Sequence, residues 1–307
     1  KRQAQMLAAH TVRWEVAQDA GFAQIVQKGE APALPALGHS VHVELQGLQP
    51  ARWYHYRFML GDAVSPTGRT RTAPAAGDMP GALRVAFASC QRWEHGHYAA
   101  WRHLAADQPD LVLYLGDYIY EYATPKTTTD LARTHSLRHA TTLADYRDRY
   151  ALHKSDPALQ LAHATCPWAV TWDDHEVQND YAADAGRGEA AGSAAFLAQR
   201  SAAWQAFYEN MPLRTTSLRG PASVTGWDTL QIYRRLRWGR LAHVHLLDSR
   251  QYRNWQACRT PEASSAPAVR PADCAELAQP QRSLLGSAQE RWLDAGLAAD
   301  TASAQAT

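Results

Sequence analysis

The chain has 307 residues, of which 46% are hydrophobic, so it can bury one large core or two unequal ones. Its 31 basic and 30 acidic residues give a net charge of +1 without a long block of either sign, which argues against a nucleic-acid scaffold or an anionic membrane as partner. No apolar run approaches the roughly 18 to 20 residues of a transmembrane helix, and the N-terminus lacks the apolar region of a signal peptide.

Short β-type segments separated by turn residues fill residues 11–74. Apolar and polar side chains alternate at 41–45 and at 54–58, which indicates strands with one buried face. The stretch "GLQPARWYHYRF" resembles a strand region of fibronectin type III and related immunoglobulin-like modules. We therefore predict a small all-β sandwich of this type. Residues 73–82 are rich in Ala, Gly and Pro and indicate a linker, so the expected domains are 1–76 and 77–307.

The pattern changes to alternating strands and helices after this linker. Residues 83–89 and 111–116 are apolar strand candidates, and residues 97–109 between them place apolar side chains on one helical face. A strand, a helix and a strand in succession predict a βαβ unit with parallel strands, and hence an α/β fold. The remaining expected elements are a helical insertion at 123–165, a strand at 169–172, a helix at 193–212, two strands within 230–248 and a helix at 287–299.

Ionisable side chains follow four of these strands where each strand ends. Cys90 follows the first and Asp117 the second. The third is followed by the acidic and histidine run at 173–176, and Asp248 follows a fourth. In an open α/β sheet the ligand crevice lies beyond the carboxyl ends of the strands. Carboxylates gathered there raise one another's pKa unless cations compensate them, so the pattern predicts a metal site.

The segment "GDYIYEY" refines this prediction. Gly116 lets the chain turn sharply, Asp117 offers a carboxylate that can bridge two metal ions, and Tyr120 follows within the same loop. A phenolate is a hard, strongly donating ligand, which favours Fe(III) over zinc or magnesium. Aromatic packing is the alternative role for this tyrosine.

Several segments together resemble PhoD-type alkaline phosphatases within the metallophosphoesterase superfamily. They are, in chain order, "FASCQRWEHGHYAAWRHLAADQPDLVLYLGDYIYEY", "VTWDDHEVQNDYA", "ENMPLR", "LDSRQYR" and "RSLLGSAQERWL". The β-rich segment at 11–74 resembles the domain that precedes the catalytic domain in that family. The resemblance covers nearly the whole chain. It implies a metallophosphoesterase-type βαβ sandwich preceded by the immunoglobulin-like domain.

The resemblance also implies a site of Fe(III) with Ca(II), with Mn or Zn as alternatives, that hydrolyses phosphomonoesters and phosphodiesters at alkaline pH. Carried over by motif, Cys90 and Tyr120 would ligate the iron, and Asp117 would bridge the metals. Asp174 would bind metal and face the phosphate, while His175 would contact the phosphoryl group or its leaving oxygen. The metal ions would hold a phosphate oxygen and generate hydroxide from a bound water. Asp174 and His175 are thus the expected catalytic residues.

Other candidates have open alternatives. Asp173 is a possible calcium ligand or a hydrogen-bonding residue, and Glu176 fits structural hydrogen bonding better than catalysis. Arg250 could bind the substrate phosphate, although an ion pair that holds the sheet edge together is the preferred interpretation. Cys258 and Cys274 flank a stretch rich in Pro, Ser and Ala, and a disulfide between them would indicate an oxidising compartment.

The sequence departs from the family at its C-terminal side. Metallophosphoesterases close their site with a late Gly-Asp-x-His or Gly-His-x-His segment, and no such segment occurs here. We therefore expect the N-terminal portion of the catalytic domain, with apolar surface left uncovered. The competing hypothesis is a non-catalytic secreted binding protein or an inactive fragment of such an enzyme. The leading hypothesis is a monomeric enzyme that acts on small phosphoesters. The family resemblance implies that it is exported by the twin-arginine route and is periplasmic or secreted.

Overall fold

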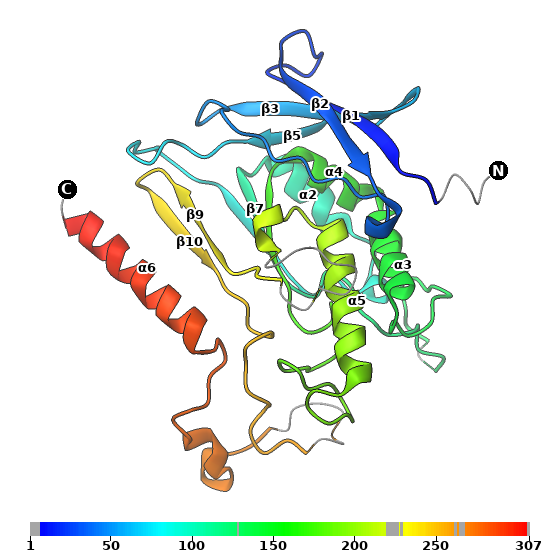
Figure 1. Ribbon diagram of the computed structural model, residues 1–307, viewed down its shortest axis with the longest axis vertical. Helices are drawn as coiled ribbons and strands as arrows, with labels where there is room; N and C mark the ends of the chain where they lie inside the picture. Colours follow the sequence, from blue (N-terminus) through cyan, green and yellow to red (C-terminus); the bar gives the residue numbers. More distant parts are fainter. Residues whose placement is uncertain are drawn as a thin grey trace.

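The computed structural model describes residues 7–127, 129–218, 227, 230–260, 263 and 268–305, the last five without their side chains. Figure 1 shows two parts, an antiparallel sheet near the N-terminus and a larger α/β part. Among the described helices, none is long and apolar enough to cross a membrane.

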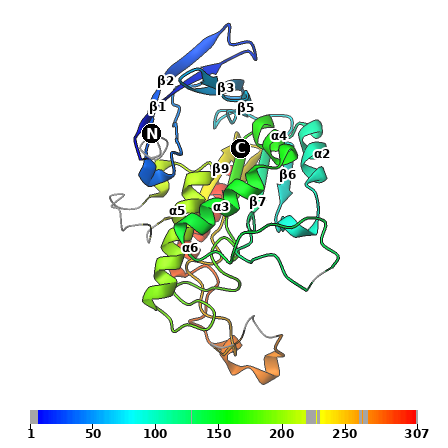
Figure 2. The same ribbon diagram turned by 90° about the vertical axis from the view of Figure 1, so that its right-hand side faces the viewer.

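The N-terminal part is one antiparallel sheet. Its strands run in the order β2-β1-β3-β4, and β5 also pairs with β3. Figure 2 shows the sheet at one end of the molecule, next to α2 and α4, and Arg71 anchors it through an ion pair with Asp110. The strands are β1 (His10–Ala17), β2 (Ile25–Ala33), β3 (Trp53–Leu60), β4 (Ala63–Val64) and β5 (Gly68–Arg71).

The predicted strand at 41–45 does not form. This segment lies instead along the α/β part, where His42 Nδ1 is 2.9 Å from the carbonyl oxygen of Leu213 and its ring stacks on Tyr208. Glu44 accepts a hydrogen bond from the backbone N–H of Thr215 at 2.6 Å. These contacts are made by the polar side chains of the segment, and the described residues of the N-terminal part form a single sheet, not the two-sheet sandwich expected from the sequence.

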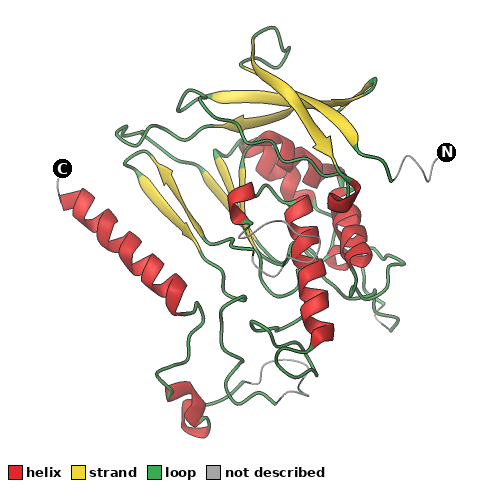
Figure 3. Cartoon of the chain, in the orientation of Figure 1, coloured by secondary structure: helices red, strands yellow, loops and turns green. Residues whose placement is uncertain are grey.

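The predicted βαβ unit is confirmed. Strands β6 (Val85–Ala88) and β7 (Leu111–Leu115) are parallel neighbours joined through α2 (Ala99–Asp107), and β8 (Trp168–Thr171) adds parallel to β7. The insertion between β7 and β8 contains α3 (Leu143–Lys154) and α4 (Pro157–Thr165), as predicted. Figure 3 shows α2, α3 and α4 on one side of the strands, whereas the long helix nearest the C-terminus lies on the other side. All four residues of β8 are buried, as expected for a strand covered on both faces.

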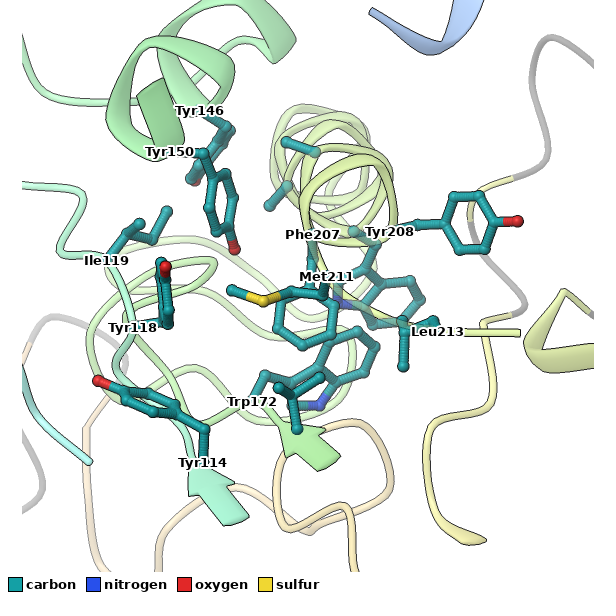
Figure 4. Packing of buried hydrophobic residues seen from close by; sticks show 14 of the residues in the cluster. Tyr114, Tyr118, Ile119, Tyr146, Tyr150, Trp172, Phe207, Tyr208, Met211 and Leu213 are labelled. Carbon is teal, nitrogen blue, oxygen red and sulfur yellow. The ribbon is translucent and has the colours of Figure 1, made fainter. Parts of the chain in front are cut away.

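The main core lies between the parallel sheet and helix α5 (Ala194–Asn210). Trp172, directly after β8, stacks on Trp204 of α5 with ring centroids 5.2 Å apart and contacts the edge of Phe207. Figure 4 shows Tyr114 and Tyr118 from β7 and its following loop in the same cluster. The residues on either side of the strand-end motifs are therefore packed in the core, which holds those motifs rigidly.

A hairpin of β9 (Arg234–Trp238) and β10 (Ala242–Leu246) forms a separate antiparallel sheet, as predicted from the two strands around Trp238. Leu246 packs with Leu111 and Ala169 of the parallel sheet. Helix α6 (Ser287–Gln305) lies beside the hairpin in Figure 1, and Trp292 of this helix meets the ring of His245 edge-on.

Apolar side chains near the edge strand β6 are exposed. The exposed fractions are 40% for Val85, 73% for Phe87 and 45% for Leu115 on β7. Because residues two apart in a strand share a face, Val85 and Phe87 lie on the same face of the sheet. The described residues leave this apolar surface uncovered.

Candidate metal centre

Glu176 ties together the loops that follow β7 and β8. Its carboxylate accepts hydrogen bonds from the backbone N–H groups of Asp117 (3.1 Å), Tyr118 (2.6 Å) and Asp173 (2.9 Å), and the side chain is fully buried. Burial and the neighbouring Asp117 carboxylate raise the pKa of Glu176 to about 8, although the three donors favour its charged form. The structural hydrogen-bonding role predicted for this residue is confirmed.

The two loops approach so closely that only glycine fits at position 116. Gly116 has φ +101°, and a Cβ atom there would lie 2.3 Å from the backbone nitrogen of Asp173. The next residue, Asp117, has φ 56°, and Cys90 at the end of β6 has φ 59°. Non-glycine residues rarely adopt this left-handed conformation, and those that do cluster at functional sites.

Three of the predicted site residues form a compact cluster. Ligating atoms of Asp117, Asp174 and His175 lie within 4.8 Å of one another, and all three residues are buried. The Cys90 thiol and the Tyr120 hydroxyl both donate to Asp117 Oδ2, at 3.5 and 3.1 Å. The structure thus brings together five residues that the sequence singled out, around a single carboxylate.

The electrostatics of this cluster fit a cation. Burial raises the pKa of Asp117 and raises that of Asp174 to about 6, the latter despite the charge of Arg250. Burial and the Asp117 charge also raise the pKa values of the Cys90 thiol and the Tyr120 hydroxyl. A bound cation reverses these shifts because it stabilises carboxylate, thiolate and phenolate together. The oxygen, sulfur and nitrogen donors converging here are therefore suited to a metal ion.

His175 is oriented by a residue that the sequence analysis did not assign. Its Nδ1 lies 2.7 Å from Glu121 Oε2, and the other oxygen of this fully buried glutamate accepts the backbone N–H of Asn179. The rings of Tyr120 and Tyr122 lie against the imidazole, with centroids 4.2 and 5.3 Å away. This leaves Nε2 as the nitrogen available to a ligand.

The charge of Glu121 also affects the protonation of His175. Burial alone would lower the pKa of His175, but the hydrogen bond and charge of Glu121, with the Asp174 and Asp117 carboxylates, raise it to about 9. The available signal in the sequence was the position of Glu121 four residues after Asp117, in the same strand-end loop. Its partner, however, is 54 residues away in the chain.

Asp173 and Arg250 form an ion pair beside the cluster. Arg250 Nε donates to Asp173 Oδ1, and its Nη2 donates to Asp174 Oδ1 at 3.0 Å. Asp173, an expected metal ligand, lies outside the three-residue cluster, and its side chain is 34% exposed. This geometry favours the ion-pair interpretation of Arg250, with Asp173 and Asp174 as its partners.

Asp248 lies next to the end of β8, since the carbonyl of the preceding Leu247 accepts a hydrogen bond from Thr171 Oγ1 at 2.8 Å, but it is not part of the three-residue cluster. β10 belongs to the hairpin, and Asp248 is fully buried, where its Oδ1 accepts the backbone N–H groups of Arg250 and Gln251. Asp248 therefore shapes the loop that carries Arg250. Farther along this loop, a disulfide joins Cys258 and Cys274.

The fold and the site together define an α/β protein with a candidate metal centre at the carboxyl ends of its parallel strands. Comparison with known proteins identifies the family. Residues 85–305 match the PhoD-like phosphatase family, and residues 1–74 match the PhoD-like phosphatase N-terminal domain. The chain belongs to the PhoD-like phosphatase family.

Two relatives place the chain more closely. It is 47% identical over 295 residues to alkaline phosphatase D of Bacillus subtilis (strain 168), which covers 95% of this chain and 48% of that protein. A solved structure titled "Structure of PhoD" has a TM-score of 0.84 and 46% identity, and covers 94% of this chain and 52% of that one. The chain thus spans about half the length of these relatives.

Proposed function

We propose that this chain carries the site for metal-dependent hydrolysis of small phosphomonoesters and phosphodiesters, with Fe(III) and Ca(II) as the metal ions and Mn or Zn as alternatives. The convergence of the Cys90 thiol and the Tyr120 hydroxyl on Asp117, beside Asp174 and His175, is the observation that carries the proposal. Thiolate and phenolate donors favour iron at that position, whereas carboxylate oxygens suit calcium.

In this proposal each residue of the site has its own role. Cys90 and Tyr120 would hold the iron, Asp117 would supply a carboxylate to both metal ions, and Asp174 would bind metal and face the phosphate. Bound metal ions would supply positive charge that holds a phosphate oxygen and lowers the pKa of a water molecule.

His175 supplies the proton chemistry. Because Glu121 engages Nδ1, Nε2 is the atom that donates to the leaving oxygen of the ester. The hydrogen bond and charge of Glu121 act to raise the pKa of His175, which favours the protonated imidazole that this role requires.

Two features of the wider organisation belong to the proposal. We assign residues 1–76 to the N-terminal domain and 77–307 to the catalytic domain. A periplasmic or secreted location is supported by the disulfide between Cys258 and Cys274, since disulfides persist in oxidising compartments.

The test is metal analysis of the purified chain with a visible absorption spectrum. Hydrolysis of p-nitrophenyl phosphate and bis-p-nitrophenyl phosphate is measured alongside, near pH 9 with added calcium. We expect bound iron with a visible band that is lost in Tyr120→Phe and kept in the matched control Tyr122→Phe. A folded sample, judged by circular dichroism, that binds no metal and hydrolyses neither ester would contradict the proposal for this chain. That result would favour the non-catalytic alternative.

A further inference from the structure

Arg92 lies beside the candidate metal centre and has no part in the mechanism above. Its guanidinium carbon is 5.8 Å from the ring centroid of Tyr120 and 5.7 Å from that of Tyr122. These are the two rings that lie against His175. Arg92 follows Cys90 by two residues in the same strand-end segment, so its charge borders the space around the predicted ligands.

A buried acid fixes the position of Arg92. Its Nε donates to Glu94 Oε2 at 3.3 Å, and Glu94 is only 2% exposed. The other oxygen of Glu94 lies 3.2 Å from His135 Nε2 and accepts a hydrogen bond from Thr124. Glu94 is thus shared between Arg92 and these further donors, which leaves the Arg92 charge incompletely compensated.

The terminal nitrogens of Arg92 are available to a ligand. Among the described residues, Nε is its only guanidinium nitrogen with a hydrogen-bond partner. Arg250 differs, because its Nε and Nη2 are both taken by carboxylates of the site. A guanidinium held in place, with its two amino groups unengaged, matches the geometry of phosphate oxygens.

We propose that Arg92 is a substrate-positioning residue that binds the non-bridging oxygens of the substrate phosphate through its terminal nitrogens. A phosphomonoester carries two negative charges at alkaline pH and a phosphodiester carries one. Arg92 therefore favours monoesters over diesters. This inference rests on the proposed function, because it assigns a role at the same site.

The first test is a kinetic comparison of wild type, Arg92→Gln, Arg92→Lys and a matched control, Arg214→Gln. The Arg214 side chain is 70% exposed, and its ion-pair partner is Glu44 of the N-terminal part. Loss of a charge-assisted contact raises the KM for p-nitrophenyl phosphate by about tenfold or more, with a much smaller change in kcat. We expect a smaller effect for bis-p-nitrophenyl phosphate, partial rescue by lysine and no effect in the control.

The second test is binding of inorganic phosphate, measured by calorimetry on the same four proteins, whose folding is checked by melting temperature. We expect affinity about tenfold weaker in Arg92→Gln than in wild type. Unchanged phosphate affinity in that variant overturns the inference, as does an equal rise in KM for both esters. A third outcome separates the two proposals. If wild type binds phosphate more tightly than Arg92→Gln but hydrolyses neither ester, the role of Arg92 is supported and the proposed function is contradicted.

Discussion

Replacing Glu94 by glutamine is expected to destabilise the fold near neutral pH. In acid the same replacement should have little effect on stability. Burial alone would raise the pKa of Glu94. The hydrogen bond from His135, the backbone and the charges of Arg92 and His135 outweigh it and lower the pKa from 4.5 to about 2. Glu94 is 2% exposed, so solvent screens these interactions little. This lowering of the Glu94 pKa corresponds to about 3 kcal/mol of folding free energy at pH 7.

The direction of the pH dependence follows from the lowered pKa. The unfolded chain takes up a proton on Glu94 near pH 4.5, before the folded chain does near pH 2, so acid shifts the equilibrium toward unfolding. The contribution is complete above pH 4.5 and disappears as the pH falls through about 2. At pH 3 roughly half or less remains.

The assay is urea denaturation of wild type and Glu94→Gln at pH 7, 5, 4 and 3. Glu30→Gln serves as the control, because Glu30 is an exposed glutamate of β2. The gap between wild type and Glu94→Gln should narrow steadily below pH 5, while the control follows wild type throughout. A gap that is absent at pH 7, or that stays constant down to pH 3, would refute the assignment of Glu94 as an ionised, paired buried acid.

Two further predictions concern a glycine of the site and the disulfide. Gly116→Ala should abolish or strongly destabilise folding, since the new Cβ would lie 2.3 Å from the Asp173 nitrogen. The control is Gly61→Ala, which is also at positive φ but in open space, and it should lower the free energy of unfolding in chemical denaturation by only about 1 kcal/mol. Replacing both Cys258 and Cys274 by serine should lower the free energy of unfolding by about 3 kcal/mol, as the bridge closes a loop of sequence separation 16. Reductant should reproduce that loss in wild type and leave the variant unchanged.

The local patterns predicted the α/β part because each element there carries its own signal. The apolar run at 111–116 predicted a strand, and the helical pattern with one apolar face before it predicted a helix. These elements form as β7 and α2. The alternation at 41–45 carried less information. It predicts a strand with a buried apolar face, whereas the contacts that hold this segment are made by its polar residue His42, with the carbonyl of Leu213 and the ring of Tyr208.

The strand-end rule predicted the meeting of Asp117, Asp174 and His175 because their strands belong to one parallel sheet. Asp248 reaches the same edge but stays outside the cluster, since β10 belongs to the hairpin, and periodicity does not reveal which sheet a strand joins. Glu121 was missed for a different reason. The role of a carboxylate depends on its partner, and this partner is brought near only by the fold.

The buried acids of the α/β part divide into two kinds by their partners. Glu176 accepts hydrogen bonds from three backbone N–H groups, and Glu121 contacts an imidazole and accepts a further N–H group, so both have structural partners. Asp117 and Asp174 face each other across less than 5 Å, with one arginine nearby, and burial raises the pKa of both. In this second pair burial outweighs the charge of His175, and for Asp174 that of Arg250 as well, each of which acts to lower the pKa. Two buried carboxylates this close together, with a thiol and a phenol donating to one of them, form a group that a cation would stabilise.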